Sequence, residues 1–253
     1  MEIYFLAVLL GVIVGIVASF FGIGGGVLFV PILILVFNYD TKMAIGTSLL
    51  AVFITSISSA LAYARRERIN YKLGLMLESA SIPGAILGAY IVTIVSVILL
   101  RKIFSVFLLL LSANLMMEKM QHNKQRTKQK SEQYTKNRLI QAEILSFLAG
   151  MLSAMLGIGG GVLKVPVMLL VLDLPIHQAT ATSSFMIVIT SFVGLTQHTI
   201  HGYVDFIFGS LLGIGATFGA QIGVKLSDYT KPRVLRRLFA VMLTLIAIEL
   251  LVK

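Results

Sequence analysis

The chain has 253 residues, of which 57% are hydrophobic and only 13% are charged, and its mean hydropathy is +0.94. Soluble domains carry roughly a quarter of their residues as charged side chains, so this composition excludes a water-soluble globule and predicts an integral membrane protein. The 22 glycines and 5 prolines do not follow the pattern of collagen or of a disordered chain. Because cysteine is absent, disulfides, thiolate metal sites and cysteine nucleophiles are excluded.

Apolar segments taken in chain order predict an all-α polytopic membrane protein. The segments long enough to cross about 30 Å of hydrocarbon are Ile3–Phe21, Met43–Ala64, Leu73–Ile94, Leu139–Leu156, Ala179–Thr199, Phe206–Val224 and Leu238–Leu251. Ile103–Met117 is marginal. Two other apolar runs, Val27–Phe37 and Val162–Leu172, hold eleven residues each and reach about half way across the bilayer.

The positive charge is gathered in three short stretches of the sequence. Arg65–Lys72, Glu118–Arg138 and Lys225–Arg237 together hold 16 of the 21 lysines and arginines. Membrane proteins retain Lys and Arg in their cytoplasmic loops, so we interpret the net charge of +10 as a sign of topology. We therefore expect the lipid bilayer as a partner and no nucleic acid.

The sequence contains an internal duplication with a constant offset of 135. The run Gly22–Pro31 (GIGGGVLFVP) returns as Gly157–Pro166 (GIGGGVLKVP), and 14 of the 27 positions from Gly22 to Ser48 match their partners. We predict two membrane repeats, residues 1–117 and 139–253, joined by a basic linker at residues 118–138. Each repeat is expected to hold a broken helical hairpin and three transmembrane helices.

The distribution of charge predicts that the two repeats are inverted relative to each other. If all three basic stretches are cytoplasmic, each repeat makes an odd number of crossings. Arg101 and Lys102 oppose this topology, because they would face outside. The larger number of basic residues favours it, with both termini external and the linker 118–138 cytoplasmic.

The two glycine turns are the first candidates for substrate binding. In an inverted pair both turns lie within the bilayer, where irregular backbone is tolerated only if it is buried in protein or lines a watery cavity. Each turn begins a short helix, whose free N–H groups and dipole favour an anion; a purely structural turn is the alternative. The candidate ligands here are Gly24, Gly25, Gly26, Gly159, Gly160 and Gly161.

Polar side chains inside the apolar segments are the remaining candidates. Lys164 replaces Phe29 of the first repeat and has no acidic residue within five positions, so we expect either a mobile anion as its partner or a side chain that reaches the surface. Glu78 is expected near the headgroups. The further candidates are Thr47, Ser48, Thr182, Ser183, Gln197 and Gln221. Their alternative roles are helix caps, bonds to helix carbonyls and interhelical hydrogen bonds. No cofactor or metal is expected.

The repeated Gly-Ile-Gly-Gly-Gly-Val-Leu-x-Val-Pro, the Thr-Ser pairs that follow it and the Gly-Tyr-Val-Asp at Gly202–Asp205 resemble the TauE/SafE family of sulfite exporters. The similarity covers nearly the whole chain except the linker. The first repeat departs from the pattern at Arg68–Tyr71. The resemblance implies a permease of a prokaryotic cytoplasmic membrane that moves sulfite, sulfoacetate or related organosulfonates, and we expect export by alternating access.

Other functions remain open from the sequence. The alternatives within transport are a carrier of another anion and a cation antiporter, which would bury carboxylates in the bilayer. An accessory subunit would need no site, and a homo-oligomer is left open. A membrane-embedded enzyme would have to use His177, His198, His201, Asp173 and Asp205. The predicted topology places His177 on the opposite side of the membrane from the other two histidines, which disfavours an enzyme.

Overall fold

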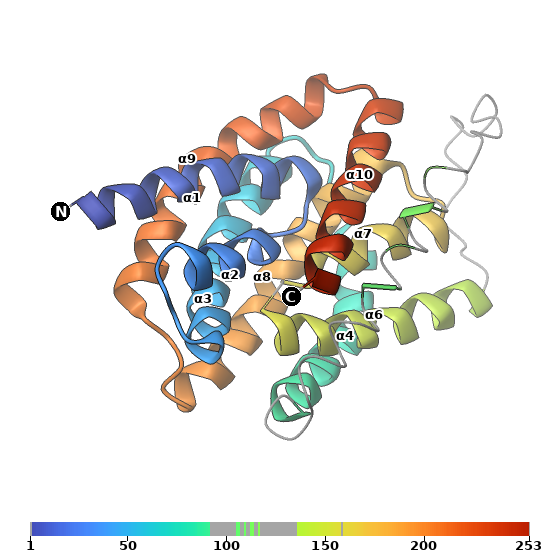
Figure 1. Ribbon diagram of the computed structural model, residues 1–253. Coiled ribbons are helices and arrows are strands. Elements are labelled where there is room, and N and C mark those ends of the chain that lie inside the picture. Colours follow the sequence, from blue (N-terminus) through green and yellow to red (C-terminus); the bar gives the residue numbers. More distant parts are fainter. Residues whose placement is uncertain are drawn as a thin grey trace.

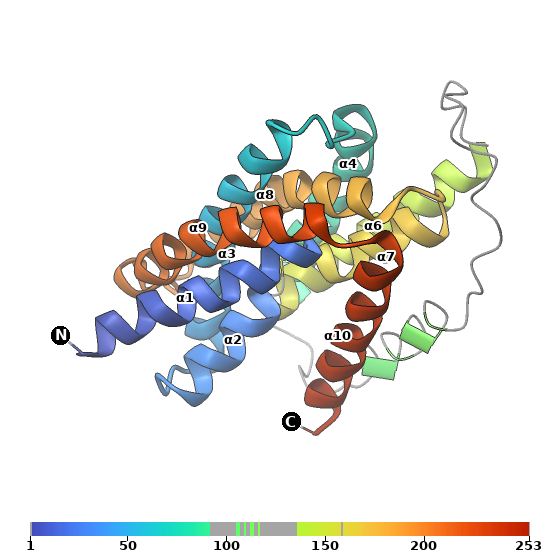
Figure 2. The same cartoon turned by 90° about the horizontal axis from the view of Figure 1, so that it is seen from above.

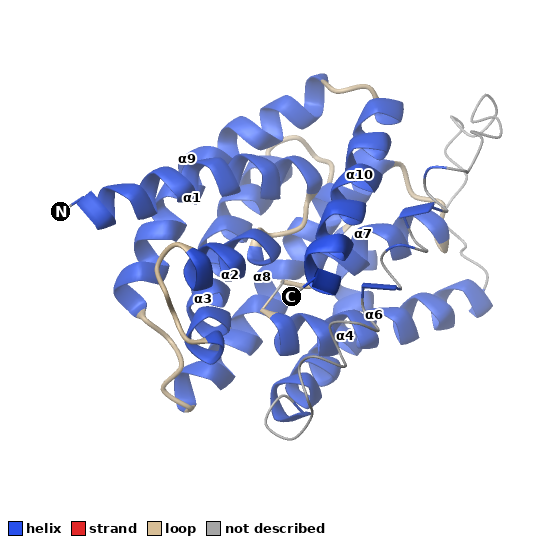
Figure 3. Cartoon of the chain, in the orientation of Figure 1, coloured by secondary structure: helices blue, strands red, loops and turns tan. Residues whose placement is uncertain are grey.

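The computed structural model describes residues 2–91, 105–106, 109, 112–113, 116, 136–157 and 159–252, and this part of the chain is made of helices and loops (Figure 3). The helices are α1 (Glu2–Phe21), α2 (Gly26–Leu35), α3 (Thr41–Ala64), α4 (Tyr71–Ile91), α6 (Lys136–Leu156), α7 (Gly161–Leu170), α8 (Ile176–Ile200), α9 (Phe206–Tyr229) and α10 (Pro232–Val252). Most of the marginal segment Ile103–Met117, and the linker up to residue 135, lie outside the described residues.

Six of the described helices are long and apolar enough to cross a membrane by length and composition: α1, α3, α4, α6, α8 and α9. The short helices α2 and α7 have ten residues each, or about 15 Å at 1.5 Å per residue, so neither crosses by itself. The expected crossing at Leu238–Leu251 is not among the six. It belongs to α10, in which Arg236 and Arg237 directly precede the apolar run and Glu249 lies within it. In Figure 2, α10 runs crosswise to α9.

The long helices form three pairs that pack in layers. α1 lies beside α9, α3 beside α8, and α4 beside α6 (Figure 1). The α3–α8 pair is central, because α3 also packs against α9 and α8 also packs against α4. The central position agrees with burial, since the apolar windows of α3 and α8 are 72% and 67% buried.

Glycines set the close approach of α1 and α9. A Cβ atom on Gly219 would lie 2.9 Å from the carbonyl carbon of Val12, and one on Gly223 would lie 3.0 Å from that of Ile16. The residue numbers rise together along both helices, so α1 and α9 run parallel. Small residues allow membrane helices to pack backbone against backbone in this way.

The same contact recurs between α4 and α6. Cβ atoms on Gly84 and Gly88 would lie 2.9 Å and 2.8 Å from the carbonyl carbons of Phe147 and Met151. These contacts are the repeat equivalents of those between α9 and α1. With the offset of 135, Gly84 and Gly88 correspond to Gly219 and Gly223, and Phe147 and Met151 correspond to Val12 and Ile16. These four glycines therefore have the packing role that their spacing predicts.

The central helices α3 and α8 are equivalent elements of the two repeats and run antiparallel. Gly46, near the start of α3, lies against His198 near the end of α8, whereas Leu49 lies against Gly194. The residue numbers therefore rise along one helix and fall along the other. The two repeats meet along this contact, and the glycine turns pack against it.

Charged side chains gather at one end of the bundle. Arg68, beyond the end of α3, lies 2.7 Å from Asp228 at the end of α9, and Arg66 also pairs with Asp228. Arg138, at the start of α6, lies 2.5 Å from Asp173 in the loop before α8. Described residues from all three basic stretches of the sequence thus lie at helix ends, as expected for loops outside the hydrocarbon.

Candidate functional site

Each short helix begins at a glycine turn, and the two turns touch. Gly25 and Gly160, which precede α2 and α7, have φ angles of 92° and 72°, a left-handed conformation that glycine adopts without strain. Within the described chain, no side chain caps either helix. A Cβ atom on Gly161 would lie 2.6 Å from the Cα atom of Ile23. The two turns therefore meet inside the protein.

Apolar side chains fill the junction between the turns. A Cβ atom on Gly24 would lie 2.9 Å from Cγ2 of Ile187 and 3.2 Å from Cγ1 of Val52, and one on Gly159 would lie 2.9 Å from the same Val52 atom. Val52 and Ile187 are equivalent residues of α3 and α8. Glycine therefore lets the two turns pack directly against these two side chains, which occupy the junction in this arrangement of the described residues.

One serine hydrogen-bonds each turn to the opposite repeat. The Ser183 hydroxyl donates to the carbonyl oxygen of Gly22 at 2.8 Å, and the Ser48 hydroxyl donates to that of Gly157 at 3.2 Å. Each serine is buried and follows a threonine in the sequence. The Thr-Ser pairs therefore contact the turns, but they do so through backbone oxygens.

The two threonines hold the starts of other helices. The Thr47 hydroxyl accepts a hydrogen bond from the backbone N–H of Asp205 at 2.9 Å, and Thr182 accepts one from Asn70 at 3.0 Å. Asp205 in turn caps α9, and its carboxylate also accepts a 2.6 Å bond from Tyr39. In this arrangement Thr47 and Thr182 join the two repeats, and their role as substrate ligands stays a prediction.

A buried ion pair lies beside the second turn. The Lys164 ammonium donates to Oε2 of Glu78 at 2.7 Å, and the two side chains are 0% and 1% exposed. Thr190 completes the group, since its hydroxyl donates to Oε1 of Glu78 and accepts from Lys164. The expectations that Lys164 has no carboxylate partner and that Glu78 lies near the headgroups are wrong, because the fold brings α4 and α7 together.

The corner at Gly160 is polar, whereas its equivalent at Gly25 is apolar. A Cβ atom on Gly160 would lie 3.3 Å from both Cε of Lys164 and Oγ of Ser153. At Gly25 the corresponding positions are Phe29, at 3.0 Å, and Ala18, at 3.1 Å. The duplication therefore produces two corners of the same shape, of which one carries a cation and a hydroxyl.

Three buried serines of α4 and α6 have hydroxyls without a partner among the described residues: Ser81 of α4, and Ser146 and Ser153 of α6, of which Ser153 lies at this corner. Each is at most 1% exposed. Buried polar atoms normally make hydrogen bonds, so an orphaned hydroxyl marks a place where water or a polar ligand is stabilised. With Lys164 they give the α4–α6–α7 region the donors that an oxyanion needs.

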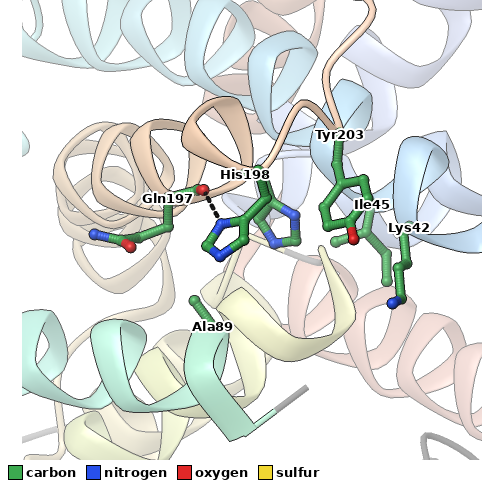
Figure 4. A pocket seen from close by; sticks show the side chains of 7 residues that line it. Lys42, Ile45, Ala89, Gln197, His198 and Tyr203 are labelled. Carbon is green, nitrogen blue, oxygen red and sulfur yellow. Dashed lines mark hydrogen bonds between the residues drawn. The ribbon is translucent and has the colours of Figure 1, made fainter. Parts of the chain in front are cut away.

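The two predicted glutamines lie elsewhere. Gln221 of α9 donates to the Ser58 hydroxyl of α3 at 2.9 Å, which is one of the two roles expected for it, and its contact with substrate stays a prediction. Gln197 borders a pocket of about 20 Å³ at the opposite end of the bundle from Arg68 (Figure 4). His198, His201, Tyr203 and Lys42 are among the other lining residues. This volume corresponds to the space of about one bound water molecule.

Comparison with known proteins decides the family. The model of the family described as "Sulfite exporter TauE/SafE" matches residues 7–250. The chain belongs to the TauE/SafE family. Its members are transporters, so this TauE/SafE protein is a multi-pass membrane transporter and not an enzyme.

Three relatives match this chain over most of their lengths. The TauE/SafE chain is 33% identical to the probable membrane transporter protein YunE of Bacillus subtilis, over 98% of this chain and 97% of YunE. It is 30% identical to the probable membrane transporter protein MJ0441 of Methanocaldococcus jannaschii, over 91% of this chain and 89% of the relative. YdhB of Bacillus subtilis, also a probable membrane transporter protein, is 28% identical over 91% of this chain. No solved structure matches the chain.

Glu78 is the residue of this TauE/SafE site that the sequence argument missed. Its nearness to the basic stretch at Arg65–Lys72 placed it at the membrane surface. The available signal was a different one: Glu78 and Lys164 are single charges of opposite sign within apolar runs of opposite repeats. Charges inside a membrane protein pair with one another, so Lys164 indicates a carboxylate partner from another apolar segment, and Glu78 is one such carboxylate.

Proposed function

We propose that this protein exports small sulfur-containing anions, such as sulfite or organosulfonates, across the cytoplasmic membrane by alternating access. The observation that carries the proposal is a buried lysine at the corner of a broken helical hairpin. Transporters of this kind bind ions near the bilayer midplane, where discontinuous helices present unpaired backbone groups. Membership in a family described as sulfite exporters supports the substrate class.

In this proposal the two repeats are inverted, with both termini external and the linker 118–138 cytoplasmic. The antiparallel contact of α3 with α8 supports the inversion, because equivalent helices of inverted repeats point in opposite directions. The positions of Arg66, Arg68 and Arg138 support the orientation, since basic residues are retained on the cytoplasmic side.

The proposed anion site is the polar corner of the second repeat. Lys164 supplies the positive charge, Ser153 supplies a hydroxyl donor, and the backbone N–H groups of Gly159, Gly160 and Gly161 complete the shell. The positive end of the α7 dipole adds to the attraction. The equivalent glycines Gly24, Gly25 and Gly26 line the opposite side of the junction. They become accessible to the anion when the turns separate.

The serines that bridge the repeats act in the conformational change. Rocking of one repeat against the other breaks the bonds from Ser48 to Gly157 and from Ser183 to Gly22. Hydroxyls released in this way become donors for a passing anion, as do those of Thr47 and Thr182. Gln197 and Gln221 are proposed to contact the anion on its way, outside the central corner.

A transport assay tests the proposal. Purified protein in proteoliposomes is expected to move ³⁵S-labelled sulfite or sulfoacetate, and Lys164→Met is expected to abolish this movement. The matched control is Lys72→Met, which removes an exposed lysine of α4 and is expected to leave transport unchanged. Transport by Lys164→Met at the wild-type rate would remove the polar corner from the pathway.

A cation antiporter is the second candidate, because Glu78 is buried as such a function requires. Lys164 neutralises that carboxylate, however, which leaves the pair without net charge and disfavours a cation. Sodium-driven proton movement in the same proteoliposomes, without movement of labelled anions, would favour the antiporter.

A further inference from the structure

We propose that Glu78 binds a proton whenever an anion binds to Lys164, so that each anion crosses the membrane together with one proton. The inference rests on the proposed function, and it assigns to Glu78 a role as the coupling carboxylate. Glu78 remains a positioning residue for the anion itself, because it acts through the charge of Lys164.

The argument begins with charge balance in a buried place. Glu78 already lies 2.7 Å from the Lys164 ammonium, and neither side chain is more than 1% exposed. An anion that reaches Lys164 therefore shares one ammonium with a carboxylate. Two negative charges around one positive charge leave an excess charge in a medium of low dielectric constant, which is strongly unfavourable.

Protonation of Glu78 removes this excess. Like charges that share a site favour the neutral form of one of them. The carboxylate takes one proton from the water on the side from which the anion enters, and it becomes a carboxylic acid. The ammonium keeps its three protons and exchanges its carboxylate partner for the anion. When the anion carries a single negative charge, the loaded site then has the same net charge as the empty one.

Thr190 makes the exchange geometrically simple. Its hydroxyl now donates to Oε1 of Glu78, while the Lys164 ammonium donates to the hydroxyl oxygen. Once Glu78 is protonated, the carboxylic acid can donate to Thr190, and the Thr190 hydroxyl is free to turn its own proton toward the anion. On the other side of Lys164, the unpartnered Ser153 hydroxyl provides a second donor.

On α4 itself, the ionisable side chain of the exposed Lys72 lies six residues before Glu78, or about 9 Å along the helix. α4 packs against α6 and α8, and α7 packs against the same two helices. The buried residues of α6 include no ionisable side chain, and those of α7 include only Lys164. The nearest in α8 is His198, which lies eight residues beyond Thr190, or about 12 Å along the helix.

The first repeat has no second copy of this group. Phe29, Gly213 and Thr55 occupy the positions that correspond to Lys164, Glu78 and Thr190. The chain therefore provides one coupling site. This predicts one proton for each anion, whichever repeat moves.

Methanesulfonate binding measured at several pH values tests the inference. This probe carries a single negative charge throughout the range from about pH 6 to pH 8, because its one sulfonate group is a strong acid. Calorimetry in buffers with different ionisation enthalpies counts the protons taken up. We expect the wild-type protein to take up close to one proton for each methanesulfonate. Its affinity is then expected to fall about tenfold for each pH unit over the range in which this proton is taken up.

Variants separate Glu78 from other sources of pH dependence. Glu78→Gln is expected to bind with an affinity that does not change with pH, and Glu78→Asp to regain the proton uptake. The matched control is Glu143→Gln of α6, which should behave as wild type. Wild-type binding without proton uptake, or an unchanged pH slope in Glu78→Gln, would overturn the coupling and leave the proposed function intact. A wild-type protein that binds none of methanesulfonate, sulfoacetate and sulfite would refute the proposed function, and this coupling with it.

Discussion

Removal of one partner of the Lys164–Glu78 pair is expected to destabilise the protein strongly. At 2.7 Å and an effective dielectric constant of about 20, two unit charges attract each other by about 6 kcal/mol. The cost of taking both charges out of water offsets much of this attraction. Breaking such a pair by removing one partner costs about 3–5 kcal/mol, because the remaining charge is buried without compensation. We predict a loss in this range for Lys164→Met and for Glu78→Gln.

The double variant provides the decisive comparison. With Lys164→Met and Glu78→Gln combined, no charge remains buried, so most of the lost stability is expected to return. The assay is reversible unfolding in mixed micelles, followed by helical circular dichroism for the wild type, both single variants and the double variant. The double-mutant cycle should give a coupling energy of at least about 2 kcal/mol. Additive losses would refute the reasoning, since they would mean that the two side chains do not interact.

Three further changes test the helix contacts, the turns and the loop at Tyr39. Gly219→Ala should cost about 1–3 kcal/mol of stability in the same unfolding assay, because the added methyl group meets the Val12 backbone; unchanged stability would argue against this contact. Ser183→Ala should cost about 1–3 kcal/mol, because a buried carbonyl oxygen loses its donor; a loss of binding alone would instead indicate a ligand. Burial and the hydrogen bond to Asp205 raise the pKa of Tyr39, so its contribution is complete below about pH 10 and is lost at higher pH. The stability advantage of wild type over Tyr39→Phe should accordingly be constant up to that pH and shrink above it, and an advantage that grows would contradict the sign.

The sequence predicted the elements of the fold well because the membrane imposes strict lengths on them. Six of the seven predicted crossings correspond to long apolar helices, and the two eleven-residue runs correspond to the short helices α2 and α7. The exception is α10, where the apolar run that follows Arg236 and Arg237 has 14 residues, or about 21 Å at 1.5 Å per residue, and contains Glu249. Hydropathy alone does not show whether such a helix crosses the bilayer or lies across its neighbours.

The candidate site was only partly predictable, because a sequence does not contain the contacts between distant helices. The duplication indicated that the glycine turns meet, and the contact of Gly161 with Ile23 agrees. The filling of the junction by Val52 and Ile187 could not be foreseen, since both are ordinary apolar residues in the middle of long helices. The partner of Lys164 was missed for the opposite reason, because Glu78 was assigned a depth from its neighbours in sequence instead of from its charge.

Inversion of the two repeats is the central claim, and the absence of native cysteines makes it directly testable. Arg65 and Ile200 are exposed, end α3 and α8 respectively, and differ by the repeat offset of 135. Single cysteines at these two positions are to be labelled in intact cells with a maleimide that does not cross the membrane. Inverted repeats predict labelling of Ile200→Cys from outside, and of Arg65→Cys only after permeabilisation. Labelling of both from the same side would contradict the claim.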